Sequence, residues 1–289
     1  MNAKKLVVGF IGLLLLAQSA MAQGFSSGTK SAPMKNTAAG DAPEPKSVIG
    51  SPIPVGNGPA SLLLCCSNAL WVANSLDNTV GVVNLDQRRM EVTIPVGEGP
   101  TGLGSYWDGR IYVANKGSNN VSVIDQSRQI VIRTIPVGTA PVAIAQTPCC
   151  SLYVYVANKD SNNVSVIDPA TDTVVQTIDL TPSTGPSAIT FVGTQEVWVA
   201  NTGSNDISVI DTSTNTLQTR IPNVGTRPSA LAPTCNNELY VALSGDNKVQ
   251  VLDTNNKTLG QLLPLAQHPR ALPSAPVERC WSRMQTAMM

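Results

Sequence analysis

Residues Tyr112–Asp125 read YVANKGSNNVSVID, and near-copies of this stretch recur along the chain. The Val-Ala-Asn part begins at positions 72, 113, 156 and 199, with a degenerate Val-Ala-Leu at 241, so the spacings are 41, 43, 43 and 42 residues. A run resembling Val-x-Val-Ile-Asp follows each copy. A proline marks the start of each unit, at Pro59, Pro100, Pro141, Pro186, Pro228 and Pro269. Three markers in one register establish an internal repeat.

Each repeat is expected to form four short strands. Val, Ile and aromatic residues fill four runs, and Asn, Gly, Ser, Asp and Pro separate them, as in strands joined by tight turns. Four-stranded units of about 40–45 residues are typical of propeller blades. The sequence therefore predicts an all-β propeller over residues 48–289, built from five full repeats. A sixth, composite blade is expected from Ser47–Val55 together with the tail Pro269–Met289, and an open ring is the alternative.

These motifs resemble the YVTN-family β-propeller repeat. The matching residues are Ile111–Asn115, Val121–Asp125 and Thr134–Gly138, and then Tyr155–Asn158 and Val164–Asp168. The resemblance covers about residues 48–269 and implies the propeller fold. It does not imply one activity, because one fold hosts many functions.

Composition excludes several classes of protein. The 289 residues are 42% hydrophobic and only 13% charged, with 19 basic and 19 acidic side chains and one histidine, His268. A disordered chain would be less apolar and carry more net charge. A nucleic-acid-binding protein would usually carry a basic excess. A single histidine argues against a histidine-rich metal site.

The first 22 residues have the pattern of a secretory signal peptide. Lys4 and Lys5 precede an apolar run over residues 6–17, and Ala20-Met21-Ala22 supplies small residues for cleavage. A membrane-spanning helix is the alternative, but the run falls short of the roughly 20 residues needed. Cleavage would leave 17 basic and 19 acidic residues. Residues 23–47 are expected to be a flexible linker, and the protein is expected in the periplasm or outside the cell.

Five aromatic residues occupy equivalent places in the repeats: Trp71, Tyr112, Tyr155, Trp198 and Tyr240. One large ring per blade would fill the space between neighbouring sheets. The alternative is a set of rings that stack on a ligand. Because the positions fall in the middle of a strand, a structural role between blades is the prediction.

The six cysteines are Cys65, Cys66, Cys149, Cys150, Cys235 and Cys280. Export favours disulfides, but the sequence does not fix their pairing. Bridges within the two adjacent pairs and a bridge from Cys235 to Cys280 are the options, beside unpaired turn residues. A metal cluster would need these thiols close together and is not predicted.

The sequence predicts no catalytic residues, metal or cofactor. Gly-x-Ser-x-Gly and Cys-x-x-Cys-His are absent, and the aspartates of Val-x-Val-Ile-Asp are expected to be turn residues. One ligand-binding candidate is a positively charged channel rim that would attract an anion. The alternative is scattered, solvated charge. The rim residues are Lys116, Lys159, Arg227, His268 and Arg270.

The functional prediction is a non-catalytic, exported propeller that binds a protein or envelope component through its loops. Two alternatives stay open. One is an enzyme or cofactor carrier of the lactonase, lyase or redox-associated kind, and the other is a structural surface-layer protein. Nucleic acid is not expected as a partner, no transmembrane segment is expected in the mature chain, and the sequence does not set an oligomeric state.

Overall fold

The computed structural model describes residues 52–65, 68–145, 152–234 and 236–264, all within one compact unit that begins at Pro52. These residues form five antiparallel sheets of four strands, each in chain order. The first sheet holds β1 (Pro59–Cys65), β2 (Ala69–Asn74), β3 (Thr79–Asn84) and β4 (Arg89–Pro95). The second holds β5 (Pro100–Ser105), β6 (Arg110–Asn115), β7 (Asn120–Asp125) and β8 (Ile130–Pro136).

The third sheet holds β9 (Pro141–Ile144), β10 (Val154–Asn158), β11 (Asn163–Asp168) and β12 (Thr173–Asp179). The fourth holds β13 (Pro186–Val192), β14 (Glu196–Asn201), β15 (Asp206–Asp211) and β16 (Thr216–Ile221). The fifth holds β17 (Pro228–Pro233), β18 (Glu238–Leu243), β19 (Lys248–Asp253) and β20 (Thr258–Pro264). Every repeat of the sequence is thus one sheet.

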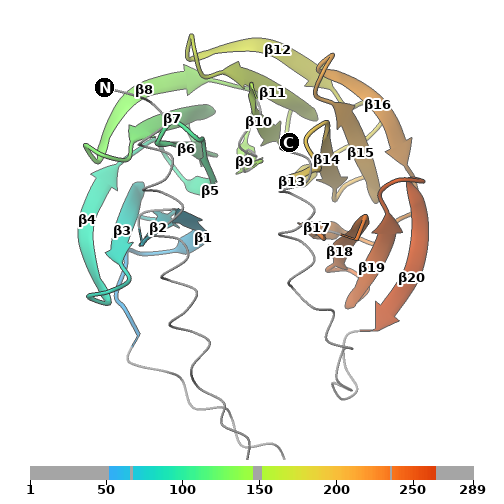
Figure 1. The fold of residues 1–289 in the computed structure, drawn as a ribbon, viewed down its shortest axis with the longest axis horizontal. Helices are drawn as coiled ribbons and strands as arrows, with labels where there is room; N and C mark the ends of the chain where they lie inside the picture. The colour runs from blue at the N-terminus through green and yellow to red at the C-terminus, as the bar shows by residue number, and fades with distance from the viewer. Residues whose placement is uncertain (1–51, 66–67, 146–151, 235, 265–289) are drawn as a thin grey trace, which may run out of the picture. The chain divides into compact units, whose positions relative to one another are not determined.

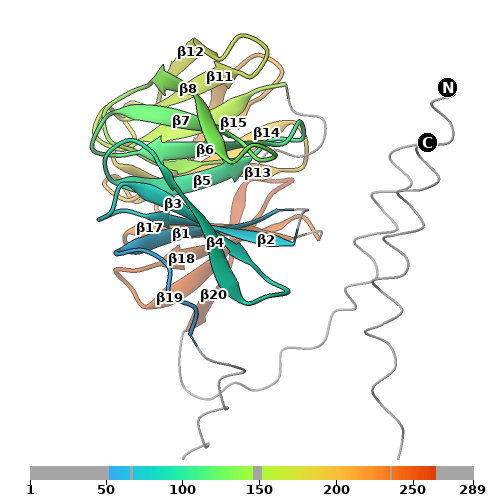
Figure 2. The same ribbon diagram turned by 90° about the vertical axis from the view of Figure 1, so that its left-hand side faces the viewer.

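The five sheets follow one another as the blades of a propeller. Their first strands, β1, β5, β9, β13 and β17, contact one another in that order on the inner side, and the fourth strands lie outside (Figure 1). Figure 2 shows the sheets from the side, with the turns at the two ends of the strands. The predicted propeller fold is confirmed. Of the expected N-terminal strand, residues 52–55 are described and form no strand. The rest of the sixth blade lies outside the described residues.

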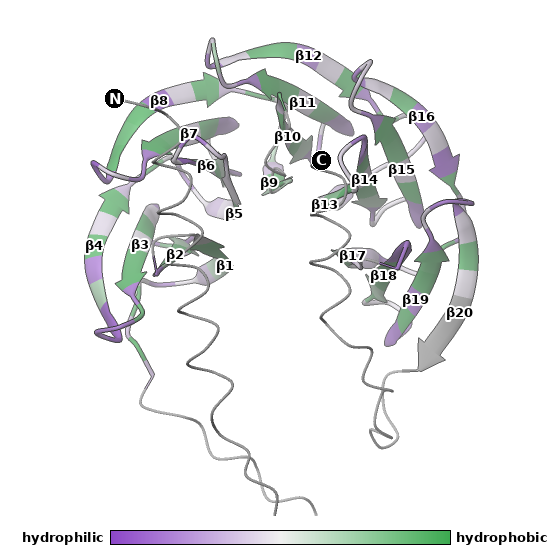
Figure 3. Cartoon of the chain, in the orientation of Figure 1, coloured by the Kyte–Doolittle hydropathy of each residue, from purple (hydrophilic) through white to green (hydrophobic). Residues whose placement is uncertain are grey.

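Turn chemistry explains where the strands end. Figure 3 shows hydrophobic residues along the strands and hydrophilic residues at the turns. Each turn between a second and a third strand ends in an asparagine with φ between 52° and 60°, a left-handed conformation that asparagine tolerates. These residues are Asn78, Asn119, Asn162, Asn205 and Asn247.

The aspartates of Val-x-Val-Ile-Asp also act in turns. Asp125 Oδ1 accepts hydrogen bonds from the backbone N–H of Ser127 and Arg128 and from the Ser127 hydroxyl. Asp211 makes the same contacts with the N–H and hydroxyl of Ser213. Both carboxylates therefore hold the turn that leads into a fourth strand, which is the role that the sequence predicted for them.

The core lies between the sheets, and each interface repeats one arrangement. Trp71 of the first sheet is packed in a cluster with Leu103, Ile111, Val113 and Ile124 of the second. Every sheet has four side chains at these positions, and we call each such set of four an aliphatic quartet. The quartets of the third, fourth and fifth sheets surround Tyr112, Tyr155 and Trp198 at the next three interfaces. The four rings are at most 1% exposed. Tyr240, in the last described sheet, is half-buried. Burial of such rings and aliphatic groups drives the blades together.

Acidification is expected to destabilise the propeller through its turn aspartates. Hydrogen bonds from Ser127 and Ser213 lower the pKa of Asp125 and Asp211 below the ordinary 3.8. Near pH 3–4 the unfolded chain then binds more protons than the folded chain. The stabilisation is complete above about pH 5 and is lost as the pH falls through the lowered pKa values. The melting temperature, measured from pH 7 to pH 2.5, should fall less steeply in the double variant Asp125→Asn/Asp211→Asn. Parallel curves would contradict this.

Candidate functional site

One end of the propeller carries two sets of loops, which together we call the loop face. The first set is the five turns between second and third strands, and the second set is the five loops that lead into the first strands. A backbone hydrogen bond joins them in every repeat, with N···O distances of 2.8–3.0 Å. The five bonds run from Ser75 to Gly58, Lys116 to Gly99, Lys159 to Ala140, Thr202 to Gly185 and Ser244 to Arg227. The loops that the sequence placed on one face therefore do meet.

The left-handed asparagines extend these links from one sheet to the next. Asn205 Oδ1 accepts the backbone N–H of Arg227 at 2.8 Å, and Asn162 Oδ1 accepts that of Gly185 at 2.8 Å. Asn78 and Asn119 bind the N–H of Gly99 and Ala140 in the same way, at 2.9 Å. Four of the five loops that lead into first strands are thus held both by their own sheet and by the preceding one.

Arg227 occupies the residue position just before the first strand of its sheet. The equivalent residues are Gly58, Gly99, Ala140 and Gly185, and all five have φ between 54° and 63°. This left-handed conformation suits glycine and costs an ordinary L-residue about 1–2 kcal/mol. The Arg227 side chain is exposed, and its carbonyl accepts hydrogen bonds from both the N–H and the hydroxyl of Ser244. A guanidinium is therefore displayed on a strained but doubly anchored backbone.

Lys116 and Lys159 lie on the same face, in the turns of the second and third sheets. Lys116 is exposed and Lys159 is half-buried. Within the described part of the chain, no ion pair involves either lysine or Arg227. The structure therefore places three of the five predicted rim residues on the loop face. His268 and Arg270 lie outside the described residues.

The described part of the loop face is of mixed charge. Four carboxylates share it, because loops from different repeats meet there: Asp77, Glu98, Asp160 and Asp246. Two of them are structural. Asp77 accepts the N–H of Asn57 and Asp246 accepts that of Thr226, each at 2.6 Å, and these backbone bonds lower the pKa of both carboxyls.

The inner wall of the propeller is formed by first strands without charged side chains. Their hydroxyl groups bind backbone: Ser187 Oγ donates to the carbonyl of Pro228 at 2.9 Å, and Thr101 Oγ1 to that of Pro141 at 3.3 Å. Both bonds join neighbouring sheets. Over residues 52–65, 68–145, 152–234 and 236–264, no cluster of His, Cys, Asp and Glu is placed to hold a metal ion. Across the same ranges no helix is long and apolar enough to span a membrane.

One of the six cysteines lies among the described residues. Cys65 lies at the end of β1, and the other five cysteines fall outside the described residues. Their pairing stays a prediction.

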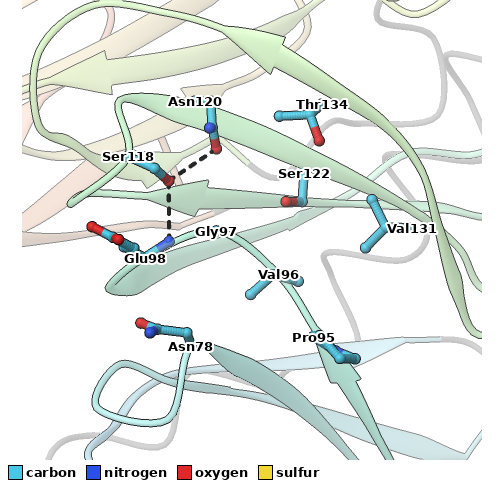
Figure 4. Close-up of a pocket in the computed structure, with 10 residues that line it drawn as sticks. All are labelled: Asn78, Pro95, Val96, Gly97, Glu98, Ser118, Asn120, Ser122, Val131 and Thr134. Carbon is cyan, nitrogen blue, oxygen red and sulfur yellow. Dashed lines mark hydrogen bonds between the residues drawn. The ribbon is translucent and has the colours of Figure 1, made fainter.

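A groove of about 370 Å³ lies beside the loop face, between the first and second sheets. Figure 4 shows Val96 and Val131 among the polar groups of Ser118, Asn120 and Ser122. These polar groups are engaged internally: Ser118 Oγ donates to Asn120 Oδ1 and accepts the N–H of Glu98. The exposed lining residues are Asn78, Pro95, Glu98 and Thr134, and Asn78 Oδ1 already accepts the N–H of Gly99. Sequence reasoning missed this groove, since its lining comes from two repeats.

Comparison with known proteins gives a matching family model and several solved structures of similar fold. A family model described as “Virginiamycin B lyase family” matches residues 46–288. The propeller chain of hydrazine synthase from Kuenenia stuttgartiensis superposes with a TM-score of 0.65 at 20% identity, covering 73% of this chain and 67% of that one. Virginiamycin B lyase from Staphylococcus aureus superposes with a TM-score of 0.62 at 19% identity, covering 72% of this chain and 70% of that one.

A third similar structure is a histidine-to-alanine variant of the same lyase, described as catalytically inactive, with quinupristin. Its TM-score is 0.61 at 19% identity, over 73% of this chain and 71% of that chain. At these identities the likeness of the structures shows the fold. Comparison with curated proteins gave no match.

Proposed function

Because this chain belongs to the virginiamycin B lyase family, we propose that it uses a family propeller as an exported binding scaffold, with the loop face as its binding surface. The ligand is an anionic group, a carboxylate or phosphate, on a protein or other component of the cell envelope. The repeat motifs support a finer assignment to YVTN-type blades within this family. Export rests on the signal-like residues 1–22.

The observation that carries the proposal is the backbone of Arg227. Glycine stands at the equivalent position in three other sheets and alanine in the fourth. An arginine in a left-handed conformation is destabilising, and residues held in such conformations cluster at binding sites. Its guanidinium is exposed and forms no ion pair with a described residue. A planar, always charged fork suits carboxylate or phosphate.

Lys116 and Lys159 can add long-range attraction to the same ligand. Exposed charges act over about 10 Å at 0.1 M salt, so binding should weaken as salt rises. Glu98 and Asp160 on the same face would repel highly charged polyanions such as nucleic acid. The mixed charge therefore favours a ligand with one anionic group among neutral or cationic ones.

Replacing Arg227 with glycine should separate binding from stability. The variant restores the residue that three other sheets carry, so the free energy of unfolding should be unchanged or higher by up to about 1 kcal/mol. Capture of material from a native envelope extract by the immobilised mature protein should fall roughly tenfold, which corresponds to about 1.4 kcal/mol. Unfolding curves and quantified pull-downs measure the two effects.

Arg88→Gly is the matched control, because Arg88 is an exposed arginine with the same left-handed conformation, at a φ of 50°, outside the loop face. It should leave capture unchanged. Equal capture by the wild type and Arg227→Gly would refute the role of Arg227. A fall in stability with Arg227→Gly would show that the arginine is kept for packing.

A lyase activity is the second candidate, favoured by the family match and by the similar structure with quinupristin. In that protein a variant lacking one histidine is described as inactive. This chain has one histidine, His268. A lyase cleaves without adding water, so products of quinupristin formed by the wild type would keep the combined mass of the substrate. Mass spectrometry should find such products with the wild type and not with His268→Ala if this candidate is right, and with neither if the binding scaffold is right.

A further inference from the structure

The first sheet presents an aliphatic quartet that no described ring covers. Leu62, Leu70, Val72 and Val83 precede Leu103, Ile111, Val113 and Ile124 of the second sheet by 41 residues each. In the second sheet the quartet packs on Trp71. In the first sheet it lines a pocket of about 740 Å³ together with Ile53 and Val55, and Leu62 is 66% exposed. An apolar face of this kind marks an interaction surface.

The chain contains one more ring in the right register. Trp71, Tyr112, Trp198 and Tyr240 each come twelve residues after the proline that opens their repeat. Trp281 comes twelve residues after Pro269. We propose that the C-terminal segment 265–289 continues the repeat and that Trp281 covers the quartet of the first sheet, so that the segment joins the two ends of the propeller.

The last described sheet offers a second anchor for the same segment. Four asparagines bind the backbone N–H of the residue that precedes the next proline, as Asn205 does with Arg227 before Pro228. Asn247 has the same left-handed conformation, with φ of 53°, and makes no such bond with a described residue. The residue before Pro269 is His268. Asn247 is therefore placed to hold the backbone of His268, which fixes the start of the segment.

A segment of the same chain is favoured over a second copy. Only 16 residues separate Trp281 from Pro264, the end of β20. A short tether gives the ring an effective concentration near millimolar, far above the concentration of a second molecule in dilute solution. A second copy would have to cover the quartet with the ring of its own last described sheet, Tyr240, which is already half-buried.

A double-mutant cycle on the whole mature chain tests the contact. If Trp281 covers the quartet, Trp281→Ala should lower the melting temperature by about 10 °C, and Leu62→Ala by several degrees. The double variant should then resemble Trp281→Ala alone. If Leu62 is uncovered, its replacement should have almost no effect. Additive shifts would overturn the proposal. Leu62→Ala with Trp107→Ala is the matched control, because Trp107 is 67% exposed, and it should be additive.

A second measurement needs no destabilised variant. In Trp107→Phe the remaining tryptophans are Trp71 and Trp198, which are buried, and Trp281. Acrylamide should quench little of their fluorescence if Trp281 is covered. If about one third of the tryptophan fluorescence were readily quenched, Trp281 would be exposed and the proposal would be overturned. A melting temperature that falls on dilution together with a dimer in sedimentation would also overturn it, because a second copy would then cover the quartet.

Discussion

Replacing Trp198 with alanine is expected to lower the free energy of unfolding by about 3–5 kcal/mol, the range for a fully buried tryptophan. The ring lies in the cluster between the fourth and fifth sheets and is 0% exposed. Its loss leaves a cavity against Leu239, Val241 and Leu252 of the fifth sheet. Chemical denaturation of the protein measures the effect.

Trp107→Ala is the control for this prediction, because Trp107 is 67% exposed. It should change the free energy of unfolding by less than about 0.5 kcal/mol. A finer comparison uses phenylalanine. Trp198 Nε1 donates to Glu196 Oε2 at 2.9 Å, whereas the buried Trp71 Nε1 has no hydrogen-bond partner among the described residues. Trp71→Phe should therefore cost less than Trp198→Phe. Equal losses for Trp107→Ala and Trp198→Ala would contradict the assignment of the ring to the core.

The repeat made the fold predictable from sequence, because each blade needs the same local chemistry. Strands full of Val and Ile, turns with asparagine and one ring per blade all recur at one spacing. The sequence shows that a glycine recurs in Ile-Pro-Val-Gly, but it does not show why the position needs glycine. A Cβ on Gly138 would lie 2.8 Å from Asn158 Cγ, so the loop can approach this asparagine only without a side chain.

The site was less predictable because its residues come from different repeats. Sequence spacing brought Lys116, Lys159 and Arg227 to one face, but it did not reveal that Asp77 and Asp246 would bind loop backbone beside them. The conformation of Arg227 was also hidden. A repeat-by-repeat alignment of the residue before each proline, which reads Gly, Gly, Ala, Gly, Arg and His, would have singled out Arg227.

Replacing Asn158 with leucine is expected to cost about 2–3 kcal/mol, because its amide is a buried link between strands. Asn158 Nδ2 donates to Asn163 Oδ1 and to Ser165 Oγ, both at 2.9 Å, and the residue is 0% exposed. Leucine would leave both acceptors without this donor, at about 1–3 kcal/mol each. Asn163 keeps a bond from Ser161 Oγ, which reduces the loss. Asn158 Oδ1 is buried and accepts no hydrogen bond from a described residue, so its removal is favourable and offsets a further part of the lost stability.

The shape of leucine is not the cause of this loss, since the fifth sheet has Leu243 at the equivalent position, 1% exposed. There Lys248 and Gln250 stand in place of Asn163 and Ser165, so the fifth sheet lacks the two oxygen acceptors that the Asn158 amide serves in the third sheet. Removing the Ser165 hydroxyl, one of the two acceptors, should therefore reduce the loss of stability caused by Asn158→Leu. Asn158→Leu/Ser165→Ala should be less destabilised than the sum of the two single variants, by about 1 kcal/mol, in denaturant unfolding. Strict additivity would show that the asparagine acts by packing and not through its hydrogen bonds.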